Sequence, residues 1–236
     1  MTDTSQLSLP LLRASQAQKH VTMNDALMRL DGLAQLVIVS RAVSLPPTAS
    51  MDGTVYAVPP GAVNAWAGHE GELAIRANGG WMFAEPKPGW RGFIRDEGVP
   101  AIHDGTEWRT GAATLAPSGA GMSFGVAQID HVLTVGTSST TAILIPSGAI
   151  VFGVTARVTA TFTGSLSNWQ LGNAGAPDRF GSGLGLDEGS WARGVLSAPM
   201  TYYEPTGLLL TATGGSFATG TVRIAVHYAE LALPLA

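Results

Sequence analysis

The chain contains no cysteine, and charged residues make up only 13% of its 236 residues. The lack of cysteine excludes disulfide bonds, thiolate catalysis and cysteine-ligated zinc sites. The formal net charge is −4, and Lys and Arg form no cluster. Nucleic-acid binding requires concentrated positive charge, so we expect no nucleic-acid partner. The longest apolar runs, such as residues 149–154, are too short to cross a bilayer, so we expect no membrane insertion.

Motifs of catalysis and cofactor binding are also missing. The sequence contains no G-x-S-x-G, no P-loop, no H-E-x-x-H and no G-x-G-x-x-G that opens a helix. The five histidines are dispersed, although His69 beside Glu70 and His103 beside Asp104 could converge on a metal ion. Because this spacing is unspecific, we predict no metal site, no cofactor and no catalytic residue.

Glycine and proline are abundant, with 30 and 14 residues respectively. A turn-rich chain with few charges is typical of compact all-β proteins. The expected fold is mainly β, with an N-terminal amphipathic helix, a small β-hairpin-repeat module and a C-terminal jelly-roll-like β-sandwich. The expected boundaries are 1–49 for an arm and the helix, 50–111 for the module, 112–125 for a linker and 126–236 for the sandwich.

One segment, residues 22–39, has the apolar periodicity of an α-helix. Its stripe at alternating three- and four-residue steps consists of Met23, Leu27, Leu30, Ala34 and Val37. Thr22 or Asn24 is placed to cap the start of the helix. Gly32 inside a helix costs about 1 kcal/mol relative to alanine, which predicts a close approach to another element there.

Residues 70–81, EGELAIRANGGW, and residues 97–108, EGVPAIHDGTEW, form an internal repeat. Each copy has a short apolar strand, a turn rich in Gly, Asn or Asp, and a Trp that follows the turn, which predicts two β-hairpins. The tryptophans of the module are Trp66, Trp81, Trp90 and Trp108. We favour a core role for them, and the alternative is a platform on which sugars stack.

From about residue 126 onward the pattern indicates strands, for example through alternating apolar and polar residues in 220–233. Six or more strands punctuated by Gly and Pro turns predict the sandwich. Residues 173–201 are expected to form a long surface loop, which is where we expect recognition chemistry.

Aromatic and charged residues in or beside this expected loop are the candidates for ligand binding, because rings beside bidentate polar groups suit neutral or acidic sugars. The candidates are Trp169, Arg179, Asp187, Trp191, Tyr202 and Tyr203. The alternative is that Trp169, Phe180 and Tyr203 belong to the core or to a subunit contact. Asp187 with Glu188 could also act as paired carboxylates or bind calcium. An exposed acidic turn is favoured because no third oxygen ligand is spaced to complete a loop.

Three segments occur together in order: SQAQKHVTMNDALMRLDGLAQL, GELAIRANGGWMF and GWRGFIRDEGVPAIHDGTEW. They resemble a bacterial family of uncharacterised domains found in prophages and gene transfer agents of alphaproteobacteria, in tail-fibre, head-spike and related surface-appendage proteins. The resemblance spans about residues 8–110. The C-terminal half, with IVFGVTARVTATFTG, RFGSGLGL and GTVRIAVHYAEL, resembles the β-sandwich that can follow this domain.

The resemblance implies a structural component of a phage-like particle without catalytic residues. The N-terminal region would contact tail, baseplate, capsid or other particle proteins, and the sandwich would bind host surface polysaccharide. The chain would form a homotrimer, with the stripe from Met23 to Val37 helping to bury a threefold interface.

The N-terminus shows no signal peptide, so the protein is expected to be made in the cytoplasm and released by lysis within the particle. Two alternatives stay open. One is a particle-borne glycan depolymerase or esterase, and the other is a purely structural adaptor between particle and fibre.

Overall fold

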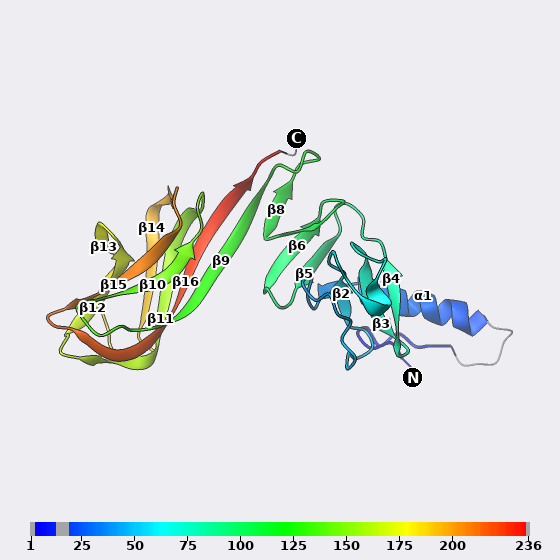
Figure 1. The fold of residues 1–236 in the computed structure, drawn as a ribbon, viewed down its shortest axis with the longest axis horizontal. Helices are drawn as coiled ribbons and strands as arrows, with labels where there is room; N and C mark the ends of the chain where they lie inside the picture. Colours follow the sequence, from blue (N-terminus) through cyan, green and yellow to red (C-terminus); the bar gives the residue numbers. More distant parts are fainter. Residues whose placement is uncertain (1–2, 13–18, 235–236) are drawn as a thin grey trace. The chain divides into compact units, whose positions relative to one another are not determined.

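The computed structural model describes residues 3–12 and 19–234, with the side chains of residues 19 and 20 left out. The chain divides into two compact units, Met1–Gly119 and Ala120–Ala236. The first holds one α-helix and a mixed sheet, and the second holds two antiparallel sheets (Figure 1). The prediction of a mainly β fold with one N-terminal helix is confirmed.

Helix α1 covers Lys19–Leu33, so the predicted helix is present but ends before residue 39. Gln35 adopts a left-handed conformation with φ 53°, which stops the helix and turns the chain into strand β1, Val37–Ile38. Val37 is therefore a strand residue, and its assignment to a helical stripe is wrong. Thr22 lies inside the helix and cannot cap it. Of the SQAQKH segment, residues 15–18 lie outside the described part of the chain.

The sheet of the first unit is built around strand β1. Its order is β4-β3-β2-β1-β5-β6-β7, and β1 runs parallel to both of its neighbours. Ile38 of β1 pairs with Val55 on one side and with Ile94 on the other, and it is fully buried. The other strands are β2 (Val55–Ala57), β3 (Leu73–Ala77), β4 (Gly80–Ala84), β5 (Arg91–Ile94), β6 (Val99–His103) and β7 (Trp108–Thr110).

The internal repeat forms two antiparallel hairpins, β3–β4 and β6–β7, as predicted. In the first hairpin Asn78 and Gly79 both have positive φ, which is the conformation that a tight two-residue hairpin turn requires. In the second, the Asp104 carboxylate accepts hydrogen bonds from the backbone N–H groups of Thr106 and Glu107. Hydrogen bonds to the Asp104 side chain thus take the place of some backbone–backbone hydrogen bonds in this turn.

The tryptophans of the first unit pack mainly as core residues. Trp66, in the short 3-10 helix η1 (Asn64–Trp66), is fully buried, and Trp108 is 5% exposed. Trp66 contacts the ring of Trp81 edge-on, with 5.0 Å between ring centroids. Gly32 of α1 lies against Ile75, and a Cβ there would be 2.7 Å from the Ile75 side chain. The close approach predicted at Gly32 is confirmed.

The second unit is a sandwich of two antiparallel sheets whose strand orders are β14-β11-β16-β9 and β10-β15-β12-β13. The chain passes repeatedly from one sheet to the other, in the pattern of a jelly roll, as predicted. Its strands are β9 (Gly121–Val132), β10 (Ser138–Ile145), β11 (Ile150–Gly164), β12 (Asn168–Asn173), β13 (Ala176–Leu184), β14 (Trp191–Thr201), β15 (Thr206–Thr213) and β16 (Phe217–Ala232). The largest fully buried side chains between the sheets include Trp169, Phe180 and Phe217.

Two expectations for this half of the chain are wrong. Residues 112–125, expected to be a linker, contain strand β8 (Ala112–Leu115) and the start of β9. Residues 173–201, expected to be a long loop, contain β13 and β14. The small residues that suggested a loop permit close packing instead, because a Cβ on Gly194 would lie 2.2 Å from the carbonyl oxygen of Phe180.

Candidate ligand-binding groove

The outward face of the sheet β14-β11-β16-β9 carries two ordered rows of side chains. Residues that are direct cross-strand partners project on the same face of a sheet. Register places Trp191, Arg157, Arg223 and Asp130 in the first row, each paired with the next. The second row, two residues along each strand, contains Arg193, Thr155, Ala225 and Gln128. All residues of the two rows except Asp130 line an open groove of about 540 Å³ within the second unit.

The first row places two arginines directly opposite each other, Arg157 on β11 and Arg223 on β16. Like charges in such a position destabilise a sheet unless they are compensated. Asp130 compensates Arg223 through a two-point ion pair, with nitrogen–oxygen distances of 2.6 and 2.7 Å. This interaction raises the pKa of Arg223 and lowers the pKa of Asp130. Within the described residues, Arg157 has no carboxylate partner.

The Arg157 side chain is oriented by a backbone group. Its Nη1 donates a hydrogen bond of 3.3 Å to the carbonyl oxygen of Gly189, in the loop that joins β13 to β14. The same loop is held to β11 by backbone hydrogen bonds between Val158 and both Gly189 and Ser190. Arg157 therefore remains exposed and charged at the edge of the groove, with a carbonyl group as its protein partner.

An aromatic ring and a second arginine form one side of the groove. Trp191 is 62% exposed, which is unusual for a residue of this size. The Arg193 guanidinium lies 5.7 Å from the centroid of the Trp191 ring, a distance that permits a cation–π interaction. Arg193 also has no carboxylate partner among the described residues. The groove thus combines an exposed ring with two arginines that lack a protein anion.

The candidates predicted from the sequence are not gathered at one site. Trp169 is 1% exposed and donates a hydrogen bond from Nε1 to the Gly185 carbonyl, so it is a core residue. Tyr202 is also buried, and burial raises its pKa. Tyr203 is 83% exposed and lies outside the groove. Of the predicted residues, Trp191 is the one that lines it.

The two remaining charged candidates lie elsewhere. Arg179 on β13 donates hydrogen bonds to the Asn173 side-chain oxygen and to the sulfur of Met200. Asp187 is exposed in the loop between β13 and β14 and, like the neighbouring Glu188, does not line the groove. Sequence reasoning identified Trp191 of this row but missed Arg157, Arg223 and Asp130. Their outward positions follow from strand alternation, but their grouping depends on cross-strand register.

The residues predicted to mediate oligomerisation differ in how far their side chains are exposed. Met23 and Leu30 are 50% and 52% exposed on α1, and Leu27 is half-buried between them. Ala34 follows the helix and is half-buried. The opposite side of α1 contributes Met28 and Asp31 to the interior of the first unit. The exposed stripe on the helix is thus shorter than the predicted one.

A second groove, of about 490 Å³, lies in the first unit and is lined by Arg41, His103 and Trp108, among others. Arg41 is already occupied, because it forms a two-point ion pair with Glu97 at 2.6 and 3.2 Å. Burial lowers the pKa of His103 and favours the neutral ring. This groove therefore presents less available positive charge than the groove at Trp191.

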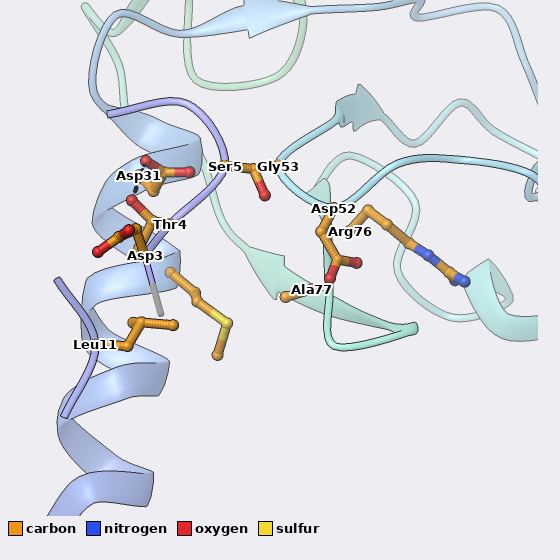
Figure 2. Close-up of a pocket in the computed structure, with 10 residues that line it drawn as sticks. Asp3, Thr4, Ser5, Leu11, Asp31, Asp52, Gly53, Arg76 and Ala77 are labelled. Carbon is orange, nitrogen blue, oxygen red and sulfur yellow. Dashed lines mark hydrogen bonds between the residues drawn. The ribbon is translucent and has the colours of Figure 1, made fainter. Parts of the chain in front are cut away.

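The rest of the described structure offers poorer candidates for a ligand or metal site. A cavity between the N-terminal arm and α1, lined by Thr4, Asp31 and Arg76 among others (Figure 2), has a volume of about 10 Å³ and is too small for a ligand other than a single water. The described residues contain no cluster of three or more His, Asp and Glu side chains able to hold a metal ion, so the acids and histidines at 69–70 and 103–104 form no such cluster. None of the described helices has the length and apolar character needed to span a membrane.

The fold and the groove define a two-unit β protein with a jelly-roll sandwich that carries an open groove on one outer face. Residues 23–109 match a family described as "Protein of unknown function (DUF2793)". No curated protein matches the chain. A solved structure with which the chain shares similarity is described as "Cyanophage Pam1 capsid asymmetric unit". The two chains are 25% identical, the match covers 47% of this chain and 84% of the other, and the TM-score is 0.30.

Proposed function

We propose that the chain is a non-catalytic structural component of a phage-like particle whose C-terminal sandwich attaches to polysaccharide on a host cell surface. The sequence resemblance to prophage and gene-transfer-agent appendage proteins supports the particle assignment. A TM-score of 0.30 does not establish a shared fold, so the proposal rests on features of this chain. The observation that carries the binding function is the exposed Trp191 ring beside an open groove on a rigid sheet.

Sugar binding suits this geometry for two reasons. The apolar face of a pyranose stacks on an aromatic ring, and the hydroxyl groups accept hydrogen bonds from fixed donors at the rim. Trp191 supplies the ring, Arg193 supplies donors from the same strand, β14, and Gln128 supplies a donor from β9, at the far side of the groove. Because the side chains project from paired strands, little ordering is needed when a ligand binds.

The N-terminal unit is proposed to attach the chain to the particle and to bring copies together. Met23 and Leu30 expose about half of their surface on α1, where a second helix would cover them. A homotrimer is the proposed assembly, and capsid, tail or baseplate proteins are the proposed particle partners. The particle is the proposed location, reached after synthesis in the cytoplasm and release by lysis.

Binding of the full chain to host cells, followed by fluorescence, tests the attachment function. The proposal expects Trp191→Ala to abolish binding, and Tyr203→Ala, which removes another exposed aromatic ring, to leave it intact. Binding that is unchanged in the Trp191 variant would contradict the proposal. Cleavage of purified capsule, detected as new reducing ends or released acyl groups, would favour the enzyme alternative.

A further inference from the structure

We propose that the groove at Trp191 recognises acidic saccharides, and that Arg157 and Arg193 bind the carboxylate groups of the polymer. This inference rests on the proposed polysaccharide-binding function and adds the chemical class of the ligand. The chain as a whole has a formal charge of −4. The two rows of the groove nevertheless contain three arginines and one aspartate.

The distribution of charge in the groove favours an anionic ligand. Asp130 neutralises Arg223, which leaves Arg157 and Arg193 as two positive charges on one small surface. Arg157 faces Arg223 in the register, and Arg223 is the one of the two that has an acidic partner, so the charge of Arg157 is not compensated by the described residues. Exceptions of this kind to local sequence rules are concentrated at functional sites. A ligand carboxylate would neutralise Arg157 and form charge-assisted hydrogen bonds.

The spacing of the two arginines fits a saccharide rather than a small ion. Arg157 pairs directly with Trp191, and Arg193 pairs with Thr155, two residues further along β11. Arg157 and Arg193 are therefore diagonal neighbours on adjacent strands, and such residues are separated by about 7–8 Å, which is within the size of a sugar ring and its substituents. Stacking on Trp191 would place a pyranose with its carboxylate within reach of either guanidinium.

The side chains on the floor of the groove are small, which leaves room for such a ring. Thr155 and Ala225, which are direct partners between β11 and β16, occupy its centre. The Thr155 hydroxyl is a hydrogen-bond partner of the His227 ring at 3.0 Å, so its orientation is fixed. Larger side chains at these two positions would fill the space beside Trp191.

A second copy of this chain is the competing occupant of the same face. Large apolar residues, among them Val126 and Val195, continue the outward surface in the next row along the sheet and are 57% and 75% exposed. The unpaired arginines disfavour this occupant, because a symmetric contact places identical positive groups near one another. An acidic saccharide is complementary to the charge, whereas a second copy is not.

Isothermal titration of the full chain with oligosaccharides of equal length tests the inference. The acidic probes are oligogalacturonate, hyaluronan and oligosialic acid fragments, and the neutral probes are galactose and glucose oligomers. We expect an acidic probe to bind, with an affinity that falls as salt is added. Arg157→Gln and Arg193→Gln are each expected to weaken it by about tenfold. Arg95→Gln, which removes an exposed charge in the first unit, is the matched control and leaves binding unchanged.

The outcomes distinguish a failure of the acidic specificity from a failure of the proposed polysaccharide attachment. In one outcome, neutral and acidic probes bind equally, and this binding is lost in Trp191→Ala but retained in both arginine variants. That result overturns the acidic specificity and leaves the proposal of polysaccharide attachment intact. No binding of any probe, together with cell binding unaffected by Trp191→Ala, overturns both. An oligomer that Trp191→Ala dissociates in light scattering identifies the face as a contact between copies and also overturns the inference. Unfolding temperatures show that each variant is folded.

Discussion

The buried carboxylate of Asp31 accepts a hydrogen bond of 2.7 Å from the hydroxyl of Thr4 (Figure 2). The same carboxylate accepts hydrogen bonds from the backbone N–H groups of Gln6 and Leu7 at 2.9 and 2.6 Å. One turn of the N-terminal arm is thereby attached to α1. Further along the arm, Leu12 exchanges two hydrogen bonds with the side chain of Asn24, two helical turns before Asp31.

Asp31→Ala should detach the arm and destabilise the first unit. It removes the acceptor of three hydrogen bonds in a position that is 2% exposed, and leaves the Thr4 hydroxyl and two backbone groups without this partner. The expected loss is about 1–3 kcal/mol for the buried groups. Hydrogen exchange should show faster exchange of residues 4–9 in the variant. Asp25→Ala, an exposed acid on the same helix, is the control, and equal exchange in both variants would contradict the attachment.

Gly32→Ala should destabilise the packing of α1 on the sheet. The added methyl group would lie 2.7 Å from Cγ2 of Ile75, a side chain that is 1% exposed. We expect a loss of about 1–3 kcal/mol from overpacking, despite the better helix propensity of alanine. Chemical denaturation measures it. In an Ile75→Ala background, which lacks Cγ2, Gly32→Ala should cost less than in the native protein, and a more stable Gly32→Ala protein would show that the close approach is absent.

Trp169→Ala separates a core role from a ligand role for that residue. Trp169 is almost fully buried and contacts Phe162, with 5.2 Å between ring centroids. Its removal should lower the free energy of unfolding by about 3–5 kcal/mol. Trp191→Ala should change stability by less than about 1 kcal/mol because the side chain is exposed. Similar stability of the two variants would contradict the assignment of Trp169 to the core.

Acid should weaken the second hairpin of the first unit through Asp104. Burial alone would raise the pKa of Asp104, but hydrogen bonds from Glu107, Thr106 and Arg109 outweigh it and hold the pKa well below its usual range. The folded state therefore binds the Asp104 proton less readily than the unfolded state, whose Asp pKa is about 3.9. The stabilisation is complete above that pH and is lost as pH falls below it.

Thermal unfolding at pH 7 and pH 3 measures this contribution. Asp104→Asn should lower the unfolding temperature more at pH 7 than at pH 3, because at pH 3 the unfolded state binds a proton at Asp104 that the folded state does not, which reduces the contribution of the carboxylate. Asp178→Asn, which removes an exposed carboxylate in the second unit, is the control and should change stability little at either pH. An Asp104→Asn effect that is equal at both pH values would exclude the charge as its cause.

The features that follow from local patterns were predictable. The apolar periodicity identified α1, and the repeat with its Asn-Gly turn identified the hairpin β3–β4. The end of the helix was not predictable from the same pattern, because Leu36 and Val37 continue the apolar spacing. These residues instead belong to the sheet, because the backbone carbonyl of Leu36 accepts a hydrogen bond from the backbone N–H of Phe93. Tertiary pairing outweighs the helical periodicity at this point.

The candidate groove could be predicted only in part. Trp191 was identified from its type and its neighbours, but it was placed in a loop that is in fact the start of β14. Arg157 and Arg223 are far apart in the sequence and become direct partners only through the register of β11 with β16. Strand alternation shows that both face outward, whereas pairing between strands of unknown order does not follow from one sequence.

The binding of an acidic oligosaccharide to the full chain and to its Trp191→Ala and Arg157→Gln variants tests the central claim most directly. The account predicts measurable, salt-sensitive binding by the native chain, its loss in the Trp191 variant, and a decrease of about tenfold in the Arg157 variant, with Arg95→Gln unchanged. Native-level binding by both groove variants would contradict it.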